Sequence, residues 1–90
     1  MGLAETFKCL SDPQRRDILS ILKEGRKSAG ELAEKLDITP QAMSYHLKLL
    51  KQAELIMEFR EKNYIYYDLN TTVFTDMLIW IKQFEGEKNE

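Results

Sequence analysis

The sequence predicts a mainly α-helical domain with one small β-hairpin. Two pairs, Asp12-Pro13 and Thr39-Pro40, place a capping residue before a proline, which is the arrangement that starts a helix. Hydrophobic residues recur at helical spacing after each pair. Residues 55–69 instead hold two runs of strand-forming residues. A chain of 90 residues suits a single domain, and in so small a domain an exposed apolar helix would need a second copy to cover it.

The first two helices are predicted over residues 3–11 and 13–24. Asp12-Pro13 ends the first helix and starts the second, and Gly25 is the stop signal of the second. In the first helix, apolar side chains recur at helical spacing at Leu3, Phe7 and Leu10. The second has an apolar stripe made by Ile18, Leu19, Ile21 and Leu22.

Two further helices are predicted to form a helix-turn-helix unit. Ser28 and Glu31 have the spacing of a capping box, which starts the shorter helix. Its buried side is predicted to hold Leu32, Ala33 and Leu36. Asp37-Ile38 turns the chain, and Thr39-Pro40 then starts the longer helix. The buried face of the longer helix is predicted to hold Met43, Leu47 and Leu50.

A hairpin and a last helix complete the predicted domain, which spans residues 1–90. The runs 55–59 and 64–69 are predicted strands, joined by a turn in which Asn63 takes a left-handed conformation. The last helix, over 71–85, is hydrophobic around most of its circumference, so it is predicted to be buried on most sides. Together these elements predict a winged helix-turn-helix of about five helices plus a two-stranded wing.

The net charge of −2 is unfavourable for a protein that binds nucleic acid, because phosphate is neutralised mainly by Lys and Arg. The distribution of charge is more favourable than its total. Residues 13–27 carry five basic and two acidic side chains, whereas residues 28–38 carry one basic and three acidic side chains. One basic face is therefore compatible with the acidic total.

The outer face of the second helix of the helix-turn-helix carries the candidate base contacts. Gln41, Ser44 and Tyr45 lie opposite the apolar stripe and can form hydrogen bonds with base edges. On one helix alone a merely solvated polar face would be the better interpretation. The preceding capped helix and the following wing favour DNA binding instead. The candidate phosphate contacts are Thr39, His46, Lys48, Arg60 and Lys62. For His46 a hydrogen-bonded position at the flank of the helix is the main expectation.

These residues resemble the ArsR-type winged-helix repressors, from about Phe7 to Phe84. The motifs that carry the resemblance are Leu10-Ser11-Asp12-Pro13-Gln14-Arg15-Arg16 with Ile18-Leu19, Glu31-Leu32-Ala33, Met43-Ser44-Tyr45-His46-Leu47-Lys48-Leu49-Leu50, Ala53-Glu54-Leu55-Ile56 and Tyr66-Tyr67-Asp68-Leu69-Asn70. Within the family the chain looks most like the SdpR-type autorepressors, through Lys51-Gln52-Ala53-Glu54 and through Ile65-Tyr66-Tyr67 followed by Leu69-Asn70-Thr71-Thr72-Val73.

The resemblance implies a homodimer that binds an inverted-repeat operator in double-stranded DNA and represses transcription until an inducer relieves it. It places the base-contacting positions on Pro40, Gln41, Ser44 and Tyr45. Pro40 and Tyr45 depart from the residues usual there, so the operator is expected to differ from those of the metal sensors. The resemblance also places the dimer interface on the first and last helices, and its predicted members are Leu3, Phe7, Phe74, Met77, Leu78 and Ile81.

The residues argue against a metal-sensing member of the family and against any cofactor. Cys9 is the single cysteine and His46 the single histidine, whereas zinc needs three or four ligands. No Cys-x-Cys lies in the third helix, and Asp76 has no histidine beside it on the last helix. Cys9 is expected to be a buried structural thiol rather than a redox sensor. A metal- or redox-responsive sensor of the same family stays an alternative.

Two other classes of function compete with the repressor. An enzyme is disfavoured, because the sequence has no phosphate-binding glycine loop and no nucleophile paired with a base. A winged-helix docking module without DNA affinity is the stronger rival, since the net charge is negative. No small-molecule substrate is expected. Relief of repression is expected through sequestration by a protein partner, at a membrane or elsewhere, and the absence of a secretory signal favours the cytoplasm.

Overall fold

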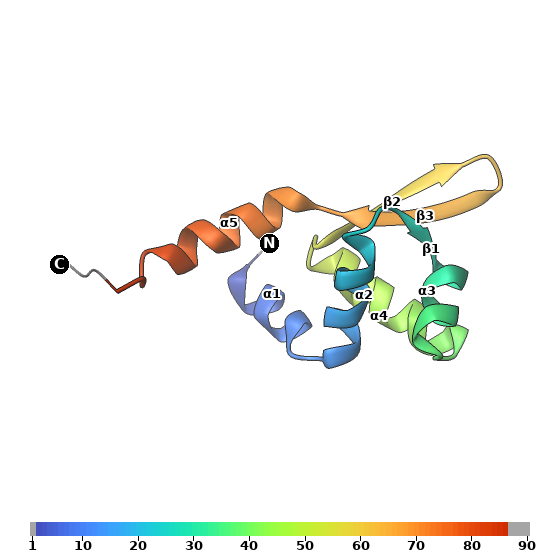
Figure 1. Cartoon of the computed structure of the whole chain (residues 1–90), viewed down its shortest axis with the longest axis horizontal. Helices are drawn as coiled ribbons and strands as arrows, with labels where there is room; N and C mark the ends of the chain where they lie inside the picture. Colours follow the sequence, from blue (N-terminus) through green and yellow to red (C-terminus); the bar gives the residue numbers. More distant parts are fainter. Residues whose placement is uncertain (1, 87–90) are drawn as a thin grey trace.

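The computed structural model describes residues 2–86, which fold into five helices and three strands (Figure 1). The elements in chain order are α1 (Leu3–Leu10), α2 (Pro13–Leu22), β1 (Lys27–Ser28), α3 (Ala29–Leu36), α4 (Pro40–Gln52), β2 (Ile56–Glu61), β3 (Tyr64–Leu69) and α5 (Thr71–Lys82). The predicted winged helix-turn-helix is confirmed. The second helix is two residues shorter than predicted, because α2 ends at Leu22.

Side-chain caps fix the start of three helices, as predicted. The Asp12 carboxylate accepts hydrogen bonds from the backbone N–H groups of Gln14 (2.8 Å) and Arg15 (3.3 Å) at the start of α2. The Thr39 hydroxyl accepts one from the Ala42 N–H at 3.1 Å. Ser28 and Glu31 form the complete capping box of α3. These bonds satisfy donors that a helix start otherwise leaves unpaired, so local sequence alone determines where these helices begin.

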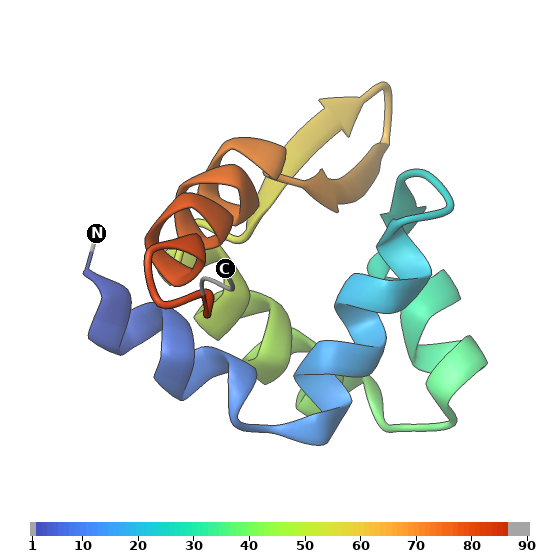
Figure 2. The same ribbon diagram turned by 60° about the vertical axis from the view of Figure 1, so that its left-hand side comes forward.

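Most of the core lies between α2, α3 and α4, which pack together (Figure 2), and α1, β2 and α5 add Cys9, Ile56 and Val73. The largest fully buried side chains are Ile18, Leu22, Leu32, Met43, Leu50, Leu55 and Thr6. The three predicted core residues of α4, which are Met43, Leu47 and Leu50, are all buried. Burial of one face of α4 leaves its opposite face in solvent.

The wing, which is the hairpin of β2 and β3, belongs to a three-stranded antiparallel sheet in the order β1-β3-β2, so β3 is the central strand. In the hairpin Ile56 pairs with Leu69 and Glu61 with Tyr64. The two residues of β1 pair with β3, Ser28 opposite Tyr66. Strand β1 was not predicted, because two residues are too short to show any periodicity. It ties the wing to the chain immediately before α3.

The turn at the wing tip corrects one prediction. Pairing continues to Glu61 and Tyr64, so only Lys62 and Asn63 connect the strands. Within this turn the left-handed backbone belongs to Lys62, with φ of 56°, and not to Asn63. A two-residue hairpin loop requires positive φ at its first residue, whichever residue occupies that position.

The last helix is exposed within one chain, contrary to the prediction that it is buried on most sides. Helix α5 extends away from the three-helix core (Figure 1), and Val73 is its one buried residue. Phe74 and Met77 pack partly against the core. The side chains further along α5 are exposed, and Ile79 reaches 65%. Burial of α5 would therefore require a surface that the single chain does not supply.

Candidate nucleic-acid interface

The exposed face of α4 carries the predicted base-contacting side chains. Gln41, Ser44, Tyr45 and Lys48 are all exposed, and Tyr45 is exposed to 59%. They follow one another at helical spacing on the side opposite the buried face of α4. A helix anchored on one face, with polar side chains on the other, can enter the major groove and present hydrogen-bonding groups to base edges.

The start of α4 adds two exposed residues with different capacities. The Thr39 hydroxyl oxygen accepts the capping bond from Ala42, so its own hydrogen remains available to a phosphate oxygen. Pro40 is exposed and has no backbone N–H to donate. Its ring can offer only an apolar contact, such as one with a thymine methyl group.

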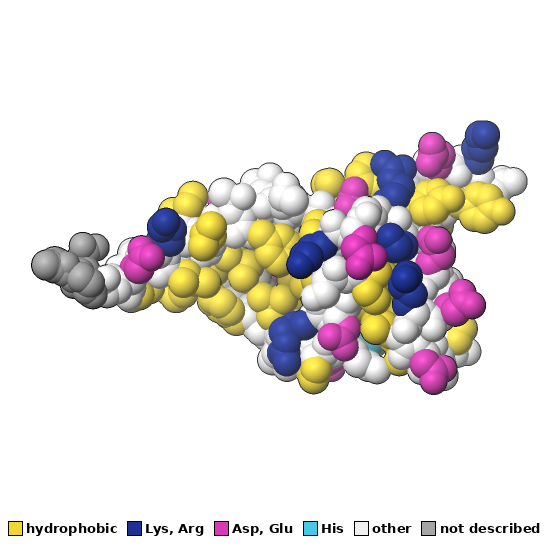
Figure 3. All heavy atoms as spheres, viewed as in Figure 1, with side chains coloured by type: hydrophobic (Ala, Val, Ile, Leu, Met, Phe, Trp, Pro, Cys, Tyr) yellow, Lys and Arg dark blue, Asp and Glu magenta, His cyan; other side chains and the backbone are white. Residues whose placement is uncertain are grey.

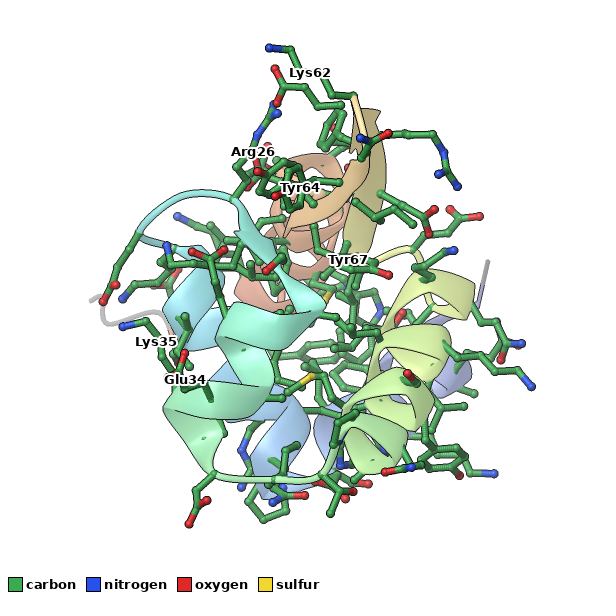
Figure 4. All side chains as sticks on the ribbon, turned by 90° about the vertical axis from the view of Figure 1, so that its right-hand side faces the viewer. Arg26, Glu34, Lys35, Lys62, Tyr64 and Tyr67 are labelled. Carbon is green, nitrogen blue, oxygen red and sulfur yellow. The ribbon has the colours of Figure 1, made fainter. Side chains whose placement is uncertain are left out.

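The wing carries two cations that form no ion pair among residues 2–86. Arg60 and Lys62 are exposed, and Lys62 stands at the hairpin tip in Figure 4. Among residues 2–86 neither side chain takes part in an ion pair within 4 Å, whereas Arg26 pairs with Glu61 and Lys51 pairs with Glu58. Arg60 and Lys62 are therefore free of the ion pairs that would compete with a phosphate contact, which stays a prediction for both residues.

Arg26 joins the wing to the body of the domain, and sequence reasoning missed it. Its guanidinium lies 4.8 Å from the centre of the Phe59 ring and 3.3 Å from the Glu61 carboxylate. The Tyr66 ring centre is 6.0 Å away. Figure 4 shows Arg26 beside the strands of the wing. No local signal identifies this role, because all three partners lie more than thirty residues further along the chain.

A hollow of about 320 Å³ separates α4 from the base of the wing and is lined by Ser44, Lys48, Lys51 and Tyr67 among others. Lys51 is engaged with Glu58, and this hydrogen bond raises the pKa of Lys51. Burial raises the pKa of Tyr67, which stays a neutral phenol at physiological pH. Lys48 is the cation of this hollow that the described residues leave unpaired.

His46 lies inside the domain, which corrects its assignment as a phosphate contact. Its side chain is only 6% exposed. Nδ1 lies 3.3 Å from the Nη1 of Arg15, and Nε2 lies 2.9 Å from the Oε1 of Gln14. The expected hydrogen-bonded flank position is confirmed. Direct phosphate contact is wrong, because both ring nitrogens face α2 and the ring has almost no accessible surface.

Arg15 is the partner of His46 that sequence reasoning missed. It is buried to 8% exposure, and its Nε donates a hydrogen bond of 2.7 Å to the carbonyl oxygen of Cys9. Its Nη1 also lies 4.0 Å from the Asp12 carboxylate. A signal existed, since Arg15 precedes Ile18, Leu19 and Leu22 by three, four and seven positions and so belongs to the buried face of α2.

Asp12 stays ionised beside this arginine. Desolvation by burial works to raise the pKa of Asp12, but hydrogen bonds from the Gln14 and Arg15 N–H groups and the charge on Arg15 outweigh it. The pKa of Asp12 therefore lies below its ordinary value. A carboxylate caps the helix start and a guanidinium lies next to it, which is a stable pairing of charges.

The potential metal ligands form no metal-binding group within residues 2–86. Among the described residues no three His, Cys, Asp or Glu side chains lie close enough together to hold a metal ion. Cys9 is buried, as expected, and burial raises the pKa of its thiol against the opposing effect of Arg15. Asp76 is exposed on α5.

Apolar side chains form a surface across α1 and α5. Leu3, Phe7, Leu78 and Ile81 are exposed, and Phe74 and Met77 are half-buried beside them. Figure 3 shows hydrophobic side chains gathered over this end of the molecule, while charged side chains gather over the helix-turn-helix and the wing. No helix within residues 2–86 has the length and apolar character needed to cross a membrane.

Comparison with known proteins agrees with this geometry. Residues 10–58 match a family model described as a helix-turn-helix domain. The transcriptional repressor SdpR of Bacillus subtilis is 49% identical over 78 residues, covering 87% of each chain. An ArsR-like transcriptional regulator from Rhodococcus superposes with a TM-score of 0.87 at 28% identity, over 91% of this chain and 75% of that one.

A further solved structure shares the fold at lower identity. The homodimeric winged helix-turn-helix DNA-binding domain Mb0332 of Mycobacterium bovis has a TM-score of 0.75 at 21% identity, over 98% of this chain and 85% of that one. Its identity carries an argument about fold alone, whereas the match to SdpR extends over most of both chains. The chain belongs to the ArsR family of winged helix-turn-helix transcriptional repressors, and within that family it resembles SdpR.

Proposed function

We propose that this DNA-binding repressor acts as a homodimer on an inverted-repeat operator and controls its own operon. The observation that carries the proposal is the exposed polar face of α4 next to the two unpaired cations of the wing. A major-groove helix flanked by phosphate-binding side chains has the composition that sequence-specific binding requires. The likeness to a transcriptional repressor supports control of transcription rather than a structural role on DNA.

The proposed contacts divide into two groups. Gln41, Ser44 and Tyr45, with Pro40 as an apolar contact, discriminate between bases. The phosphates are bound by Thr39, Lys48, Arg60 and Lys62. His46 is left out of this set because it is buried.

The proposed dimer interface is the apolar surface of α1 and α5. Single chains rarely expose this much contiguous apolar surface without a partner, and a relative of the same fold is described as homodimeric. Two-fold symmetry would place two copies of α4 on one face of the duplex, with half-sites about 34 Å apart. The operator would then be an inverted repeat.

Repression is proposed to be independent of metal and relieved by a protein partner. Metal independence is supported by the finding that no three His, Cys, Asp or Glu side chains of residues 2–86 could hold a metal ion. A partner can lower operator affinity only if it binds the DNA-free state better than the DNA-bound state. Covering α4, or holding the dimer in an arrangement that cannot span both half-sites, would satisfy this condition. A repressor acts on chromosomal DNA, so the proposed location is the cytoplasm.

A salt series tests the central proposal. Double-stranded DNA is selected from a random pool by the wild-type protein, and its affinity is compared with that of unselected DNA at increasing salt. The repressor predicts tight binding of the selected DNA and an affinity that falls steeply with salt. Absence of binding even at low salt would support the winged-helix docking module, which the net charge of −2 favours.

A further inference from the structure

We propose that His46 and Arg15 are positioning residues for base recognition, which hold the rotation of α4 about its axis relative to α1 and α2. The inference rests on the proposed function, because it concerns how the base-contacting face of α4 is aimed. Neither residue is accessible enough to contact DNA itself.

Three elements meet at the Arg15 guanidinium. Its Nε donates to the Cys9 carbonyl oxygen at the end of α1, and its Nη1 donates to Nδ1 of His46 on α4. The backbone of Arg15 belongs to the first turn of α2, where its N–H also donates to the Asp12 carboxylate. One planar, rigid side chain thus spans the end of α1, the start of α2 and the middle of α4.

The imidazole of His46 is held on both sides. Arg15 can only donate, so Nδ1 of His46 must accept and carries no proton. Nε2 then carries the proton and donates it to the amide oxygen of Gln14. Gln14 and Arg15 are adjacent on α2, so two bonds from neighbouring positions fix one ring.

Rotation of α4 would break both bonds at once. Leaving the guanidinium and the ring nitrogens unpaired in a buried site is costly, which disfavours rotated arrangements. Tyr45 precedes His46 and is exposed on the base-contacting side, with its ring centre 5.9 Å from that of His46. A small rotation of α4 would displace Tyr45 and Ser44 relative to the bases, and apolar packing alone tolerates such rotations better than hydrogen bonds do.

The link to α1 gives the network a second consequence. Arg16 donates a 2.7 Å hydrogen bond to the Leu10 carbonyl oxygen, next to the Cys9 carbonyl bound by Arg15. The end of α1 is therefore clamped to α2 by two arginines. Because α1 also carries Leu3 and Phe7 of the proposed dimer interface, the same clamp sets the orientation of α4 relative to that interface.

Amide substitutions separate the two bonds of His46. In His46→Asn the side-chain oxygen can take the place of Nδ1 and accept from Arg15, but nothing reaches Gln14. In His46→Gln the terminal amide can take the place of Nε2 and donate to Gln14, but Nδ1 is lost. His46→Leu keeps the volume approximately and loses both bonds.

The test measures discrimination, which is the affinity for the selected DNA divided by the affinity for unselected DNA, at a temperature where each variant is folded. We expect His46→Leu to lower discrimination by about tenfold or more, comparable to the loss of one well-placed base contact. His46→Asn should retain most of the discrimination, because the bond to Arg15 persists. Arg15→Lys should lose it, since an ammonium group cannot bridge Cys9 and His46 together.

Ile18→Val is the matched control for a purely structural effect. Ile18 is fully buried on the same face of α2 as Arg15 but makes no contact through a polar group. It should lower stability, because it removes a buried methyl group, while leaving discrimination unchanged. Unchanged discrimination in His46→Leu and Arg15→Lys would overturn the inference, even if both variants are less stable.

The wild-type protein supplies a second measurement that does not depend on folding of the variants. Nitrogen NMR of the His46 ring distinguishes its two tautomers. The Nε2–H form at neutral pH, with a slowly exchanging Arg15 Nε–H, is expected, and the Nδ1–H form would overturn the inference. If the wild-type protein prefers the selected DNA and the His46 and Arg15 variants keep that preference, this inference alone is refuted. If the wild-type protein binds no DNA, both this inference and the proposed function are refuted.

Discussion

Phe7 of α1 and Trp80 of α5 pack against each other with ring centres 5.8 Å apart. The contact joins the two ends of the described chain into one apolar surface. Both rings remain partly exposed, at 40% and 39%, so the pair covers only part of this surface. The remainder is available to a second copy of the chain, which is the basis of the first prediction.

Replacement of Ile81 by Asp is expected to dissociate or unfold the dimer. In a two-fold interface each substitution is present twice, so two new carboxylates would be desolvated without partners. Sedimentation at tens of micromolar should show a dimer for the wild type and a smaller or unfolded species for the variant. Thr75→Asp, at an exposed polar position of α5, serves as control and should remain dimeric. A well-folded wild-type monomer under these conditions would contradict the proposed interface.

Replacement of Gln41 by Ala is expected to cost about 1–3 kcal/mol on the selected operator and little on random DNA. The reason is that the Gln41 amide can both donate to and accept from a base edge, and its contribution therefore depends on the base. Fluorescence anisotropy with both DNAs measures the two losses. Equal losses on both would show that Gln41 binds the backbone and does not discriminate.

Replacement of Lys62 by Ala should weaken binding to the selected and the random DNA by the same factor. It should also reduce the steepness of log affinity against log salt by about one unit. Lys62 has no acidic partner within residues 2–86, so its whole charge is free to displace a counterion from phosphate. Lys82→Ala, at the far end of α5, removes the same charge without altering the wing. If both lysine variants change the slope equally, the effect reflects net charge rather than a wing contact.

The elements that the sequence predicted are those that short-range chemistry determines. Asp12, Ser28 and Thr39 each bind N–H groups two or three residues away, so their caps are visible in a few letters. The buried face of α4 follows from helical spacing. The same spacing predicts the opposite face of α4, which is exposed and carries the proposed base contacts.

What the sequence did not predict depends on long-range partners. Strand β1 exists because Ser28 meets Tyr66, and the burial of His46 depends on Gln14 and Arg15, more than thirty positions away. Arginine is mostly exposed in proteins and histidine is intermediate, so residue type did not indicate that Arg15 and His46 are buried together. The hydrophobic composition of α5 indicates burial without indicating which chain provides it, so only the chain length and the family resemblance predicted a second copy as the partner of this helix.

Zinc, copper, cadmium and arsenite at micromolar concentration are expected to leave operator affinity unchanged. The single thiol is buried and lacks two further ligands among the described residues. Affinity is measured with and without each metal in a chelator-treated buffer. A tenfold or greater loss that Cys9→Ser or Asp76→Ala abolishes would instead establish a metal-responsive sensor.

Cys9 is expected to resist alkylation in the folded protein. Burial raises the pKa of its thiol, with the charge and hydrogen bond of Arg15 opposing in part, so the thiolate that reacts is rarer than in the unfolded chain. Because the folded-state pKa is the higher one, this group stabilises the fold below its ordinary pKa, and the stabilisation is lost as the pH rises through the folded value. Alkylation at neutral pH, followed by mass spectrometry, should proceed at the rate of opening and accelerate in urea. Rapid modification of the native protein, together with oxidant-dependent release from DNA that Cys9→Ser removes, would show that Cys9 is a redox sensor.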